Sequence, residues 1–291
     1  MVVALTENHR TRSSNPGGRN IVAVANKILD GSIDSLFASS ASDDEIITIH
    51  TDAKAIPDIK THLITTADRD QIWDFGRKWF DLHLAPTLAL SERVFTQVDK
   101  AFKPEDKAIL DQIFAIMGGS RMMCPSNEGL FGTQRINQVI REHRDHPGKT
   151  VKSYGIKHLP WLTGELVMMT ANDYQIRVFN GDLGVILPVK RDDEPVQLMA
   201  LFPSLDGYGA YSLAQLGDKL VRAYATTVHK AQGDEHQHVA LILPPEDTLL
   251  HTRELIYTAV TRAKHSVVIV GKQQVLELSL IHISEPTRPE R

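Results

Sequence analysis

The chain has 291 residues, enough for one large domain or two modest ones. Hydrophobic residues make up 42% and charged residues 23%, as in ordinary globular proteins, and the net charge of −4 excludes a strongly basic nucleic-acid coat while allowing a local binding groove. No run approaches the roughly 18 apolar residues of a membrane span. We therefore expect no membrane contact. Cys124 is the single cysteine, so we expect no internal disulfide and a cytoplasmic location. No Cys/His spacing is typical of zinc, so we expect no metal site.

Apolar periodicity predicts α/β elements in the first half of the chain. The expected elements are a helix over 21–29 with Asn20 as its N-cap, a strand over 45–50, helices over 69–84, 105–117 and 133–144, and a short strand over 120–126. Trp73 and Trp79 fall at helical spacing, which favours core positions over a base-stacking platform. Cys124, at the expected strand end, is interpreted as a buried, inert thiol.

The pattern changes between residues 160 and 222, where short apolar runs alternate with turn signals such as Asn180-Gly181-Asp182. This alternation predicts a small antiparallel β unit, barrel-like in size. The α/β pattern then resumes with an expected strand over 239–243, a helix over 253–263 and a strand over 266–270. An α/β domain interrupted by a β insertion is therefore the expected architecture.

The last thirteen residues, SLIHISEPTRPER, lack this periodicity and contain two prolines. They resemble translated sequencing-adapter sequence, so we predict that 279–291 is a non-native tail and that the chain is a fragment.

Polar side chains gather in TTVHKAQGDE, residues 226–235, at a density that a plain turn does not need, although a structural loop remains an alternative. Two further stretches accompany it, RELIYTAVTRAK (253–264), which follows the apolar strand, and LTENHR (5–10), which is a weak signal by itself. The three stretches resemble motifs V, VI and IV of superfamily 1 DNA helicases, and specifically those of the RecD family, the alpha subunits of exodeoxyribonuclease V. WLTGELVMMTANDYQIRVFNGDLG and CPSNEGLFGTQRINQVI also resemble RecD segments, so that the resemblance covers about residues 1–278.

This resemblance implies a RecA-like second motor domain with an SH3-like insertion. Residues 1–159 would form the first part of the motor domain, 160–222 the insertion and 223–278 the remainder. The implied activity is that of an ATP-dependent 5′→3′ DNA helicase, a hydrolase of ATP that works in double-strand break repair and recombination. The implied partners are single-stranded DNA and the other two subunits of exodeoxyribonuclease V.

The resemblance also assigns nucleotide contacts. Arg262 is the candidate for the charge that meets the γ-phosphate in the transition state, and Arg10 is a second phosphate ligand. Gly233 would let the backbone approach the nucleotide, Glu235 would accept from the ribose hydroxyl, and Gln232 would lie beside them. The alternatives are a helix-end arginine at 262, a surface arginine at 10, and a turn glycine with a solvated acid at 233 and 235.

DNA contacts are expected from groups that donate hydrogen bonds and release them at each step. The candidates are Thr226, Thr227, His229, Lys230, Ser126 and Asn127. Tyr224 and Tyr257 are interpreted as core residues rather than base-stacking ones.

A complete helicase also needs a Walker A loop. The only Gly-Lys-Thr is Gly148-Lys149-Thr150, which has His143 where the first glycine belongs and follows a helix, so we interpret it as a turn. The ligands of Mg²⁺ and most of those of ATP are therefore expected in another motor domain, and the fragment alone is expected to be inactive. Two alternatives remain: a stand-alone RecD-like or conjugative helicase, and a non-catalytic DNA- or protein-binding module of the same fold.

Overall fold

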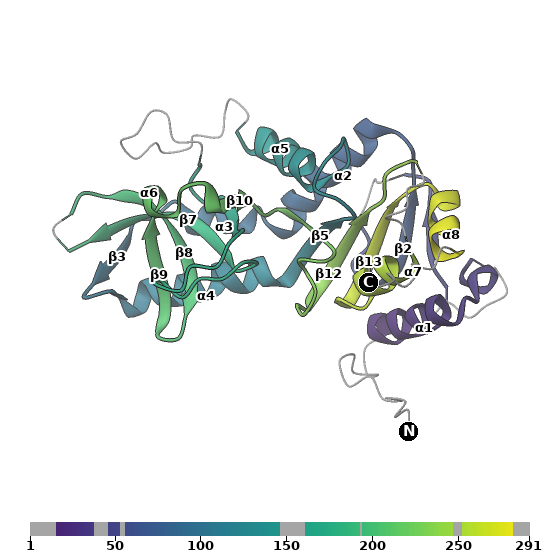
Figure 1. Cartoon of the computed structure of the whole chain (residues 1–291), viewed down its shortest axis with the longest axis horizontal. Coiled ribbons are helices and arrows are strands. Elements are labelled where there is room, and N and C mark those ends of the chain that lie inside the picture. The colour runs from purple at the N-terminus through teal and green to yellow at the C-terminus, as the bar shows by residue number, and fades with distance from the viewer. Residues whose placement is uncertain are drawn as a thin grey trace, which may run out of the picture. The chain divides into compact units, whose positions relative to one another are not determined.

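The computed structural model describes residues 16–37, 46–52, 56–145, 161–192, 194–246 and 252–281 (Figure 1). These residues fall into two compact units, each of which is assembled from separate stretches of the chain. Unit 1 comprises 1–75, 121–133 and 226–291, and unit 2 comprises 76–120 and 134–225. Arg10 and Gly148-Lys149-Thr150 lie outside the described residues. Within the described part, no helix is long and apolar enough to cross a membrane.

Unit 1 is an α/β layer built on a six-stranded sheet, in the order β1-β2-β13-β12-β5-β11. The strands are β1 (Thr48–His50), β2 (Lys60–Thr65), β5 (Ser120–Cys124), β11 (Ala225–Thr227), β12 (His236–Ile242) and β13 (Ala263–Gly271). The helices are α1 (Pro16–Asp30), η1 (Ile33–Leu36), α7 (Arg253–Val260), α8 (Gln273–Ile281) and the start of α2 (Arg69–His83). The sheet matches the expected α/β fold class, because β1, β2, β13 and β12 run parallel.

The two central strands of this sheet, β12 and β13, consist mainly of buried aliphatic residues. Val267 to Val270 of β13 and Val239 to Ile242 of β12 are fully buried, which is the apolar run that a parallel strand covered on both faces requires. Helix α1 packs against β2 and β13, and α7 packs against β12 and β13 (Figure 1). The start of α1 approaches β13 so closely that a Cβ at Gly17 would clash with the carbonyl oxygen of His265.

Asn20 corrects one sequence-based expectation. It does not cap a helix, because α1 begins at Pro16 and Asn20 lies inside it. Its buried amide instead pins α1 to neighbouring backbone: Oδ1 accepts from the Thr61 N–H at 2.7 Å, and Nδ2 donates to the carbonyl of Ile46 at 2.9 Å. A polar residue followed by apolar ones looks like a cap, and only the tertiary contact separates the two roles.

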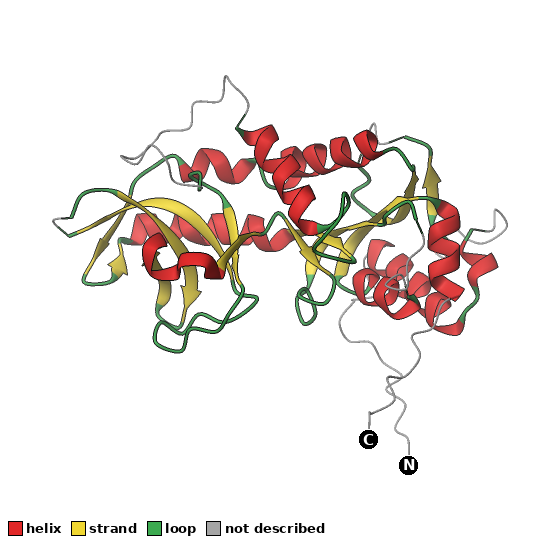
Figure 2. Ribbon diagram, turned by 45° about the horizontal axis from the view of Figure 1, so that its top comes forward, coloured by secondary structure: helices red, strands yellow, loops and turns green. Residues whose placement is uncertain are grey.

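Unit 2 contains a second sheet with the order β10-β6-β7-β3-β4, in which β8 pairs with β7 and β9. The strands are β3 (Phe95–Val98), β4 (Ala101–Phe102), β6 (Leu166–Met169), β7 (Leu183–Arg191), β8 (Gln197–Ser204), β9 (Gly207–Ser212) and β10 (Leu220–Arg222). The helices are α3 (Pro86–Ser91), α4 (Pro104–Gly119), α5 (Thr133–Arg144), α6 (Leu213–Leu216), η2 (Gly217–Lys219) and the second half of α2 (Figure 2). Strand β7 is the centre of this unit, since it pairs with β6, β8 and β3 along its length.

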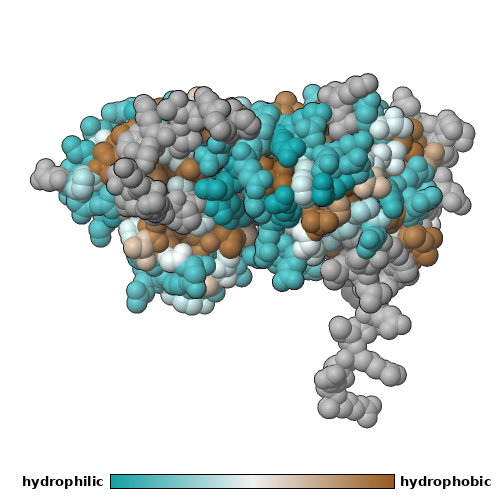
Figure 3. Space-filling view, turned by 90° about the horizontal axis from the view of Figure 1, so that it is seen from above, coloured by the Kyte–Doolittle hydropathy of each residue, from teal (hydrophilic) through white to brown (hydrophobic). Residues whose placement is uncertain are grey.

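The antiparallel strands expected between 160 and 222 are present as β6 to β10, and their sheet also takes in β3 and β4 from residues 95–102. The sequence pattern missed these two strands because they are short, and it also missed β2, α3 and α8. Trp79, Cys124 and Tyr224 are buried as expected. Ser279, Leu280 and Ile281, the first residues of the expected non-native tail, complete α8, and Leu280 is buried. On the face shown in Figure 3, hydrophobic atoms form scattered patches among hydrophilic ones.

Candidate functional site

The stretch that follows β11 forms a tight turn. The main-chain N–H groups of Lys230 and Ala231 donate to the carbonyl of Thr227 at 3.1 and 3.2 Å. Thr226 and Thr227 are buried, and within the described residues the Thr226 hydroxyl has no hydrogen-bond partner. His229 is exposed and Lys230 is partly exposed. Of these four predicted DNA contacts, the structure thus presents two at the surface.

The loops that follow β5 and β11 begin side by side, because the Val228 N–H donates to the carbonyl of Cys124 at 3.2 Å. Ser126 donates from its hydroxyl to the Glu128 carbonyl at 3.0 Å, and Asn127 Oδ1 accepts from the hydroxyl of Thr133 at 3.0 Å. These bonds close the loop against the start of α5. Ser126 and Asn127 therefore share one edge of the sheet with the turn that carries His229.

The candidate nucleotide residues meet at the start of β12 and β13. The Arg262 guanidinium donates to the carbonyl of Asp234 at 3.3 Å, and the His236 N–H donates to the carbonyl of Arg262 at 2.8 Å. The two motif-like stretches, far apart in sequence, are thus joined at Arg262. Gly233 has φ +105° and open space where a Cβ would stand, while the Glu235 carboxylate is held by Lys264 at 2.7 Å.

Arg262 follows α7 and is only 8% exposed. Besides Asp234, its guanidinium donates to the Thr258 carbonyl at 3.2 Å and lies 3.5 Å from the Thr261 hydroxyl. All the partners it has among the described residues are therefore neutral oxygens. The Thr258 contact is the one that the helix-end alternative requires.

Arg121 is a buried charge that the sequence analysis did not select. Burial lowers its pKa to about 10, and the carboxylate of Asp234 partly opposes that shift. Arg121 thus lies near Asp234, whose carbonyl accepts from Arg262. The signal was present, since a lone arginine interrupts the apolar run of SRMMC.

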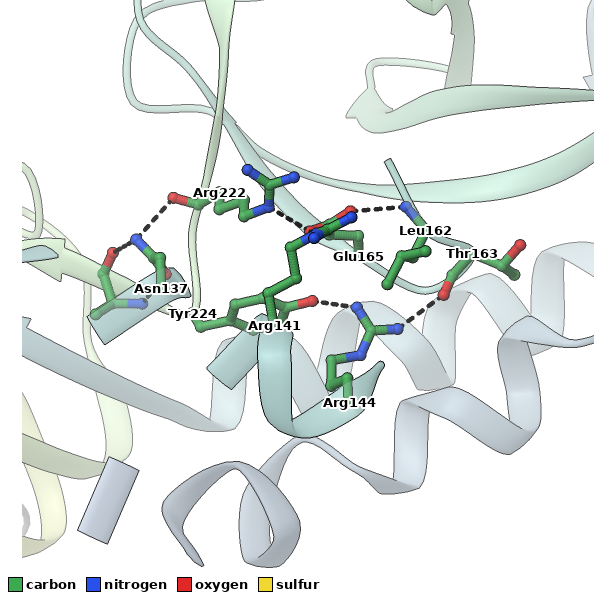
Figure 4. A network of polar contacts seen from close by, with 9 residues as sticks. Asn137, Arg141, Arg144, Leu162, Thr163, Glu165, Arg222 and Tyr224 are labelled. Carbon is green, nitrogen blue, oxygen red and sulfur yellow. Dashed lines mark hydrogen bonds and ion pairs between the residues drawn. The ribbon is translucent and has the colours of Figure 1, made fainter. Parts of the chain in front are cut away.

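A second polar cluster lies within unit 2 and surrounds the fully buried carboxylate of Glu165 (Figure 4). Arg222 Nε donates to Glu165 at 2.5 Å, Arg141 Nε lies 3.6 Å from it, and the Leu162 N–H donates to it at 2.7 Å. The Arg222 guanidinium also stacks over Trp161 at 4.9 Å. One carboxylate therefore gathers two arginines from α5 and β10.

Tyr224 and Asn137 extend this cluster toward β11. Arg144 donates to the Tyr224 hydroxyl and to the carbonyl of Thr163, and burial raises the pKa of Tyr224 to about 12. Asn137 binds both main-chain groups of Ala225: its Nδ2 donates to the carbonyl at 3.0 Å and its Oδ1 accepts from the N–H at 2.9 Å. Ala225 is the residue immediately before Thr226, so the cluster fixes the backbone from which the candidate DNA-binding stretch starts.

No group of three His, Cys, Asp or Glu side chains suited to a metal ion occurs in the ranges that the structure describes.

The chain matches known helicases in sequence. Residues 222–270 match the UvrD-like helicase C-terminal domain. The chain is 34% identical over 183 residues to the RecBCD enzyme subunit RecD of Mycobacterium tuberculosis, covering 60% of this chain and 29% of that protein. It is also 34% identical over 162 residues to the ATP-dependent RecD2 DNA helicase of Deinococcus radiodurans, covering 56% of this chain and 21% of that protein. The resemblance to RecD is thereby confirmed, and the chain spans less than a third of the length of these relatives.

Among solved structures, a Pif1 helicase from Bacteroides in complex with ADP-AlF3 and ssDNA covers 97% of this chain and 54% of its own, at 14% identity and a TM-score of 0.39.

Proposed function

We propose that this chain is the C-terminal part of an ATP-dependent DNA helicase of the RecD type, which moves 5′→3′ along single-stranded DNA in double-strand break repair and recombination. The observation that carries the proposal is the position of Arg262. Its buried guanidinium joins the motif-like stretch 226–235 to the one at 253–264 and contacts only neutral oxygens there.

Electrostatics gives this arrangement a functional interpretation. Buried guanidinium groups are normally compensated by carboxylates, because removing a charge from water costs several kcal/mol. Arg262 contacts carbonyl and hydroxyl oxygens instead, so its charge remains available to an anion. In phosphoryl transfer, an arginine supplied from a facing domain stabilises the charge that develops on the γ-phosphate.

The nucleotide would meet this chain through few residues. Gly233 offers main chain beside open space, and Gln232 is exposed next to it. Glu235 can reach a ribose hydroxyl only by sharing or leaving its ion pair with Lys264. ATP bound here would supply the phosphate whose hydrolysis drives movement, and the Mg²⁺ ligands and the Walker A loop are proposed to belong to the first motor domain. Arg10 is proposed as a second phosphate ligand on sequence grounds alone.

The DNA backbone is proposed to follow the edge formed by the loops after β5 and β11. His229 and Lys230 are available there at the surface, together with Ser126 and Asn127. Thr226 and Thr227 are buried in β11. Their proposed role is either to donate a hydrogen bond to a phosphate that approaches β11 or to stabilise the turn that follows this strand.

The relatives suggest two biological settings. A RecD subunit would work with the other two subunits of exodeoxyribonuclease V. The stand-alone alternative also has support, since RecD2 of Deinococcus radiodurans shows 34% identity over 162 residues, against 183 residues for the RecD subunit of Mycobacterium tuberculosis. Co-purification of the complete protein with two further subunits would favour the first setting, and a monomer that unwinds DNA by itself would favour the second.

The proposal is tested by separating the two roles in the complete protein. Arg262→Ala should abolish ATP turnover at saturating DNA and leave single-strand affinity nearly intact, because the arginine acts on the reaction barrier. His229→Ala should weaken single-strand affinity and restore turnover when more DNA is added. A non-catalytic module would show no DNA-stimulated turnover before any mutation, and that result would overturn the proposal.

A further inference from the structure

The connection between β6 and β7, residues 170–182, is long for a hairpin and is held by many hydrogen bonds within unit 2. Asp173 and Val178 exchange main-chain hydrogen bonds at 2.8 and 3.2 Å, which closes a short inner loop. The Asn180 N–H donates to Asn172 Oδ1 at 2.9 Å, and the Phe179 N–H donates to Asp182 at 2.7 Å. Ordered loops of this length usually carry function.

This loop is also anchored to the sheet around it. Lys219 Nζ forms an ion pair with Asp173 at 2.9 Å, and the Tyr211 hydroxyl donates to the carbonyl of Ile176 at 3.1 Å. The side chains that it carries are consequently presented at fixed positions, so that little conformational freedom remains to be lost on binding.

Two aromatic side chains on this anchored loop point into solvent. Tyr174 is 75% exposed and Phe179 is 41% exposed. Their ring centroids lie 6.0 Å apart at 71°, so each ring braces the other edge to face while most of the Tyr174 ring stays uncovered. Asn172 Nδ2 lies 3.2 Å from the Tyr174 hydroxyl, which further restricts that ring.

The surroundings of this aromatic pair are polar. Asn172, Gln175, Arg177 and Asn180 are all exposed on the same loop. Arg177 occupies the left-handed region with φ +55°, and its guanidinium has no ion-pair partner among the residues that the structure describes. Two rings bordered by amides and one free cation form too small an apolar area for a stable protein interface, which buries about 800 Å² on each partner. They suit a nucleic-acid strand, whose bases stack on aromatic rings while its phosphates meet a cation.

We propose that Tyr174 and Phe179 form a stacking site for the bases of single-stranded DNA, with Arg177 contacting the adjacent phosphate. This inference rests on the proposed function and extends it, because it adds base contacts to a chain whose other DNA candidates address the backbone. It also assigns a role to a loop of the β unit that the motif resemblance leaves without one.

The test compares an oligothymidylate with an abasic phosphodiester oligomer of equal length, using fluorescence anisotropy and the full chain. The wild type should bind the oligothymidylate more tightly. Tyr174→Ala combined with Phe179→Ala should raise the Kd for the oligothymidylate roughly 5- to 150-fold, the range for loss of base stacking, and leave the abasic Kd unchanged. Tyr174→Phe should retain tight binding, because the ring is kept.

Leu205→Ala is the matched control, since Leu205 is an 89% exposed apolar residue in the turn between β8 and β9 of the same sheet. It should change neither Kd. All variants should keep the wild-type thermal midpoint, because the altered side chains are exposed.

The other outcomes overturn the stacking site in distinguishable ways. Unchanged affinity of the double alanine variant for the oligothymidylate would refute it and leave the helicase assignment standing, which depends on ATP turnover and Arg262. An equal loss for both oligomers would indicate a phosphate contact without base stacking. A variant that keeps DNA affinity but loses association with the other subunits would identify a protein-docking surface. Absence of any single-strand binding by the wild type would refute the stacking site outright, whereas the Arg262 experiment would still decide the proposed function.

Discussion

Arginines are compensated differently in the two units. In unit 2, Arg141 and Arg222 converge on the buried carboxylate of Glu165. In unit 1, the buried Arg262 contacts only carbonyl and hydroxyl oxygens. A buried charge that is paired with an opposite charge can be part of the fold's own structure. A buried charge without such a pair retains its desolvation cost, and an anion that binds there would offset it. Substitutions in the Glu165 cluster should therefore lower the stability of the fold, and substitution of Arg262 should lower activity.

Glu165→Gln should give the largest loss of stability. The guanidinium groups of Arg141 and Arg222 would then lose the counter-charge of Glu165, and we expect the free energy of unfolding to fall by about 2–3 kcal/mol. This is less than the roughly 3–5 kcal/mol for a fully buried pair, because the arginine side chains are 28% exposed. Urea unfolding followed by tryptophan fluorescence measures it. Glu142→Gln, at an exposed position of α5, is the control and should change little. Equal effects of the two substitutions would remove the distinction between the clusters.

Asn137→Ala should come next, with a loss of about 2 kcal/mol in the free energy of unfolding, because the main-chain groups of Ala225 would remain buried without their partners. The same measurement on Gln138→Ala, an exposed neighbour in α5, should show almost no loss. If Asn137→Ala also weakens single-strand binding while Gln138→Ala does not, then the cluster in unit 2 positions the stretch that begins at Thr226. Wild-type stability of Asn137→Ala would contradict the importance of these bonds.

Mild acid should destabilise unit 1. Burial, followed by the neighbouring charge of His50, lowers the pKa of His62, and burial and His265 lower that of His238. The unfolded chain therefore takes up protons first: stability is complete above about pH 6.5 and is lost as the pH falls through the folded-state pKa values. Urea midpoints recorded from pH 7.5 to 5.5, about one unit either side of that value, should fall with pH, and His62→Gln should flatten the curve. A midpoint that rises on acidification would contradict the sign.

Lys264→Met should have the smallest effect on stability, because its ion pair with Glu235 is partly exposed on both sides. We expect a change within about 1 kcal/mol. If Glu235 contacts the nucleotide, freeing it should instead alter the nucleotide concentration at half-maximal turnover. A stability loss as large as that of Glu165→Gln would show that this surface pair also holds the fold.

Much of unit 1 was predictable because long apolar runs carry their own signal. The strand over 239–243 and a helix over 253–263 are predicted from the apolar pattern alone, and the structure has β12 and α7 there. Short elements were not predictable: β3 and β4 have too few residues to show a period, and Asn20 resembles a helix cap in any linear pattern.

The candidate site was predictable to the extent that it lies within continuous motifs. The contact of Arg262 with Asp234 joins two such motifs, but neither motif indicates what else that guanidinium touches. Within unit 1, only the fold brings Arg121 near Asp234, and within unit 2, only the fold brings Arg141 and Arg222 to Glu165. Exposure is equally invisible to periodicity, since Tyr174 and Phe179 occur between turn signals of the expected β unit, where the pattern indicates neither a strand nor a surface site.

Single-turnover hydrolysis of ATP by the complete protein tests the central claim most directly, because it isolates the chemical step from DNA binding and product release. Arg262→Ala should slow this step about 10³- to 10⁵-fold, or about 4–7 kcal/mol, and Arg262→Lys should recover little of it, since an ammonium lacks the planar fork of a guanidinium. Arg253→Ala is the matched control: this arginine begins α7, the helix that Arg262 follows, and it also donates to a main-chain carbonyl, that of Leu280 at 2.7 Å, so its loss should leave the rate near wild type. A rate within about threefold of wild type for Arg262→Ala, well short of the effect of an arginine finger, would show that Arg262 only caps α7 and would contradict the account.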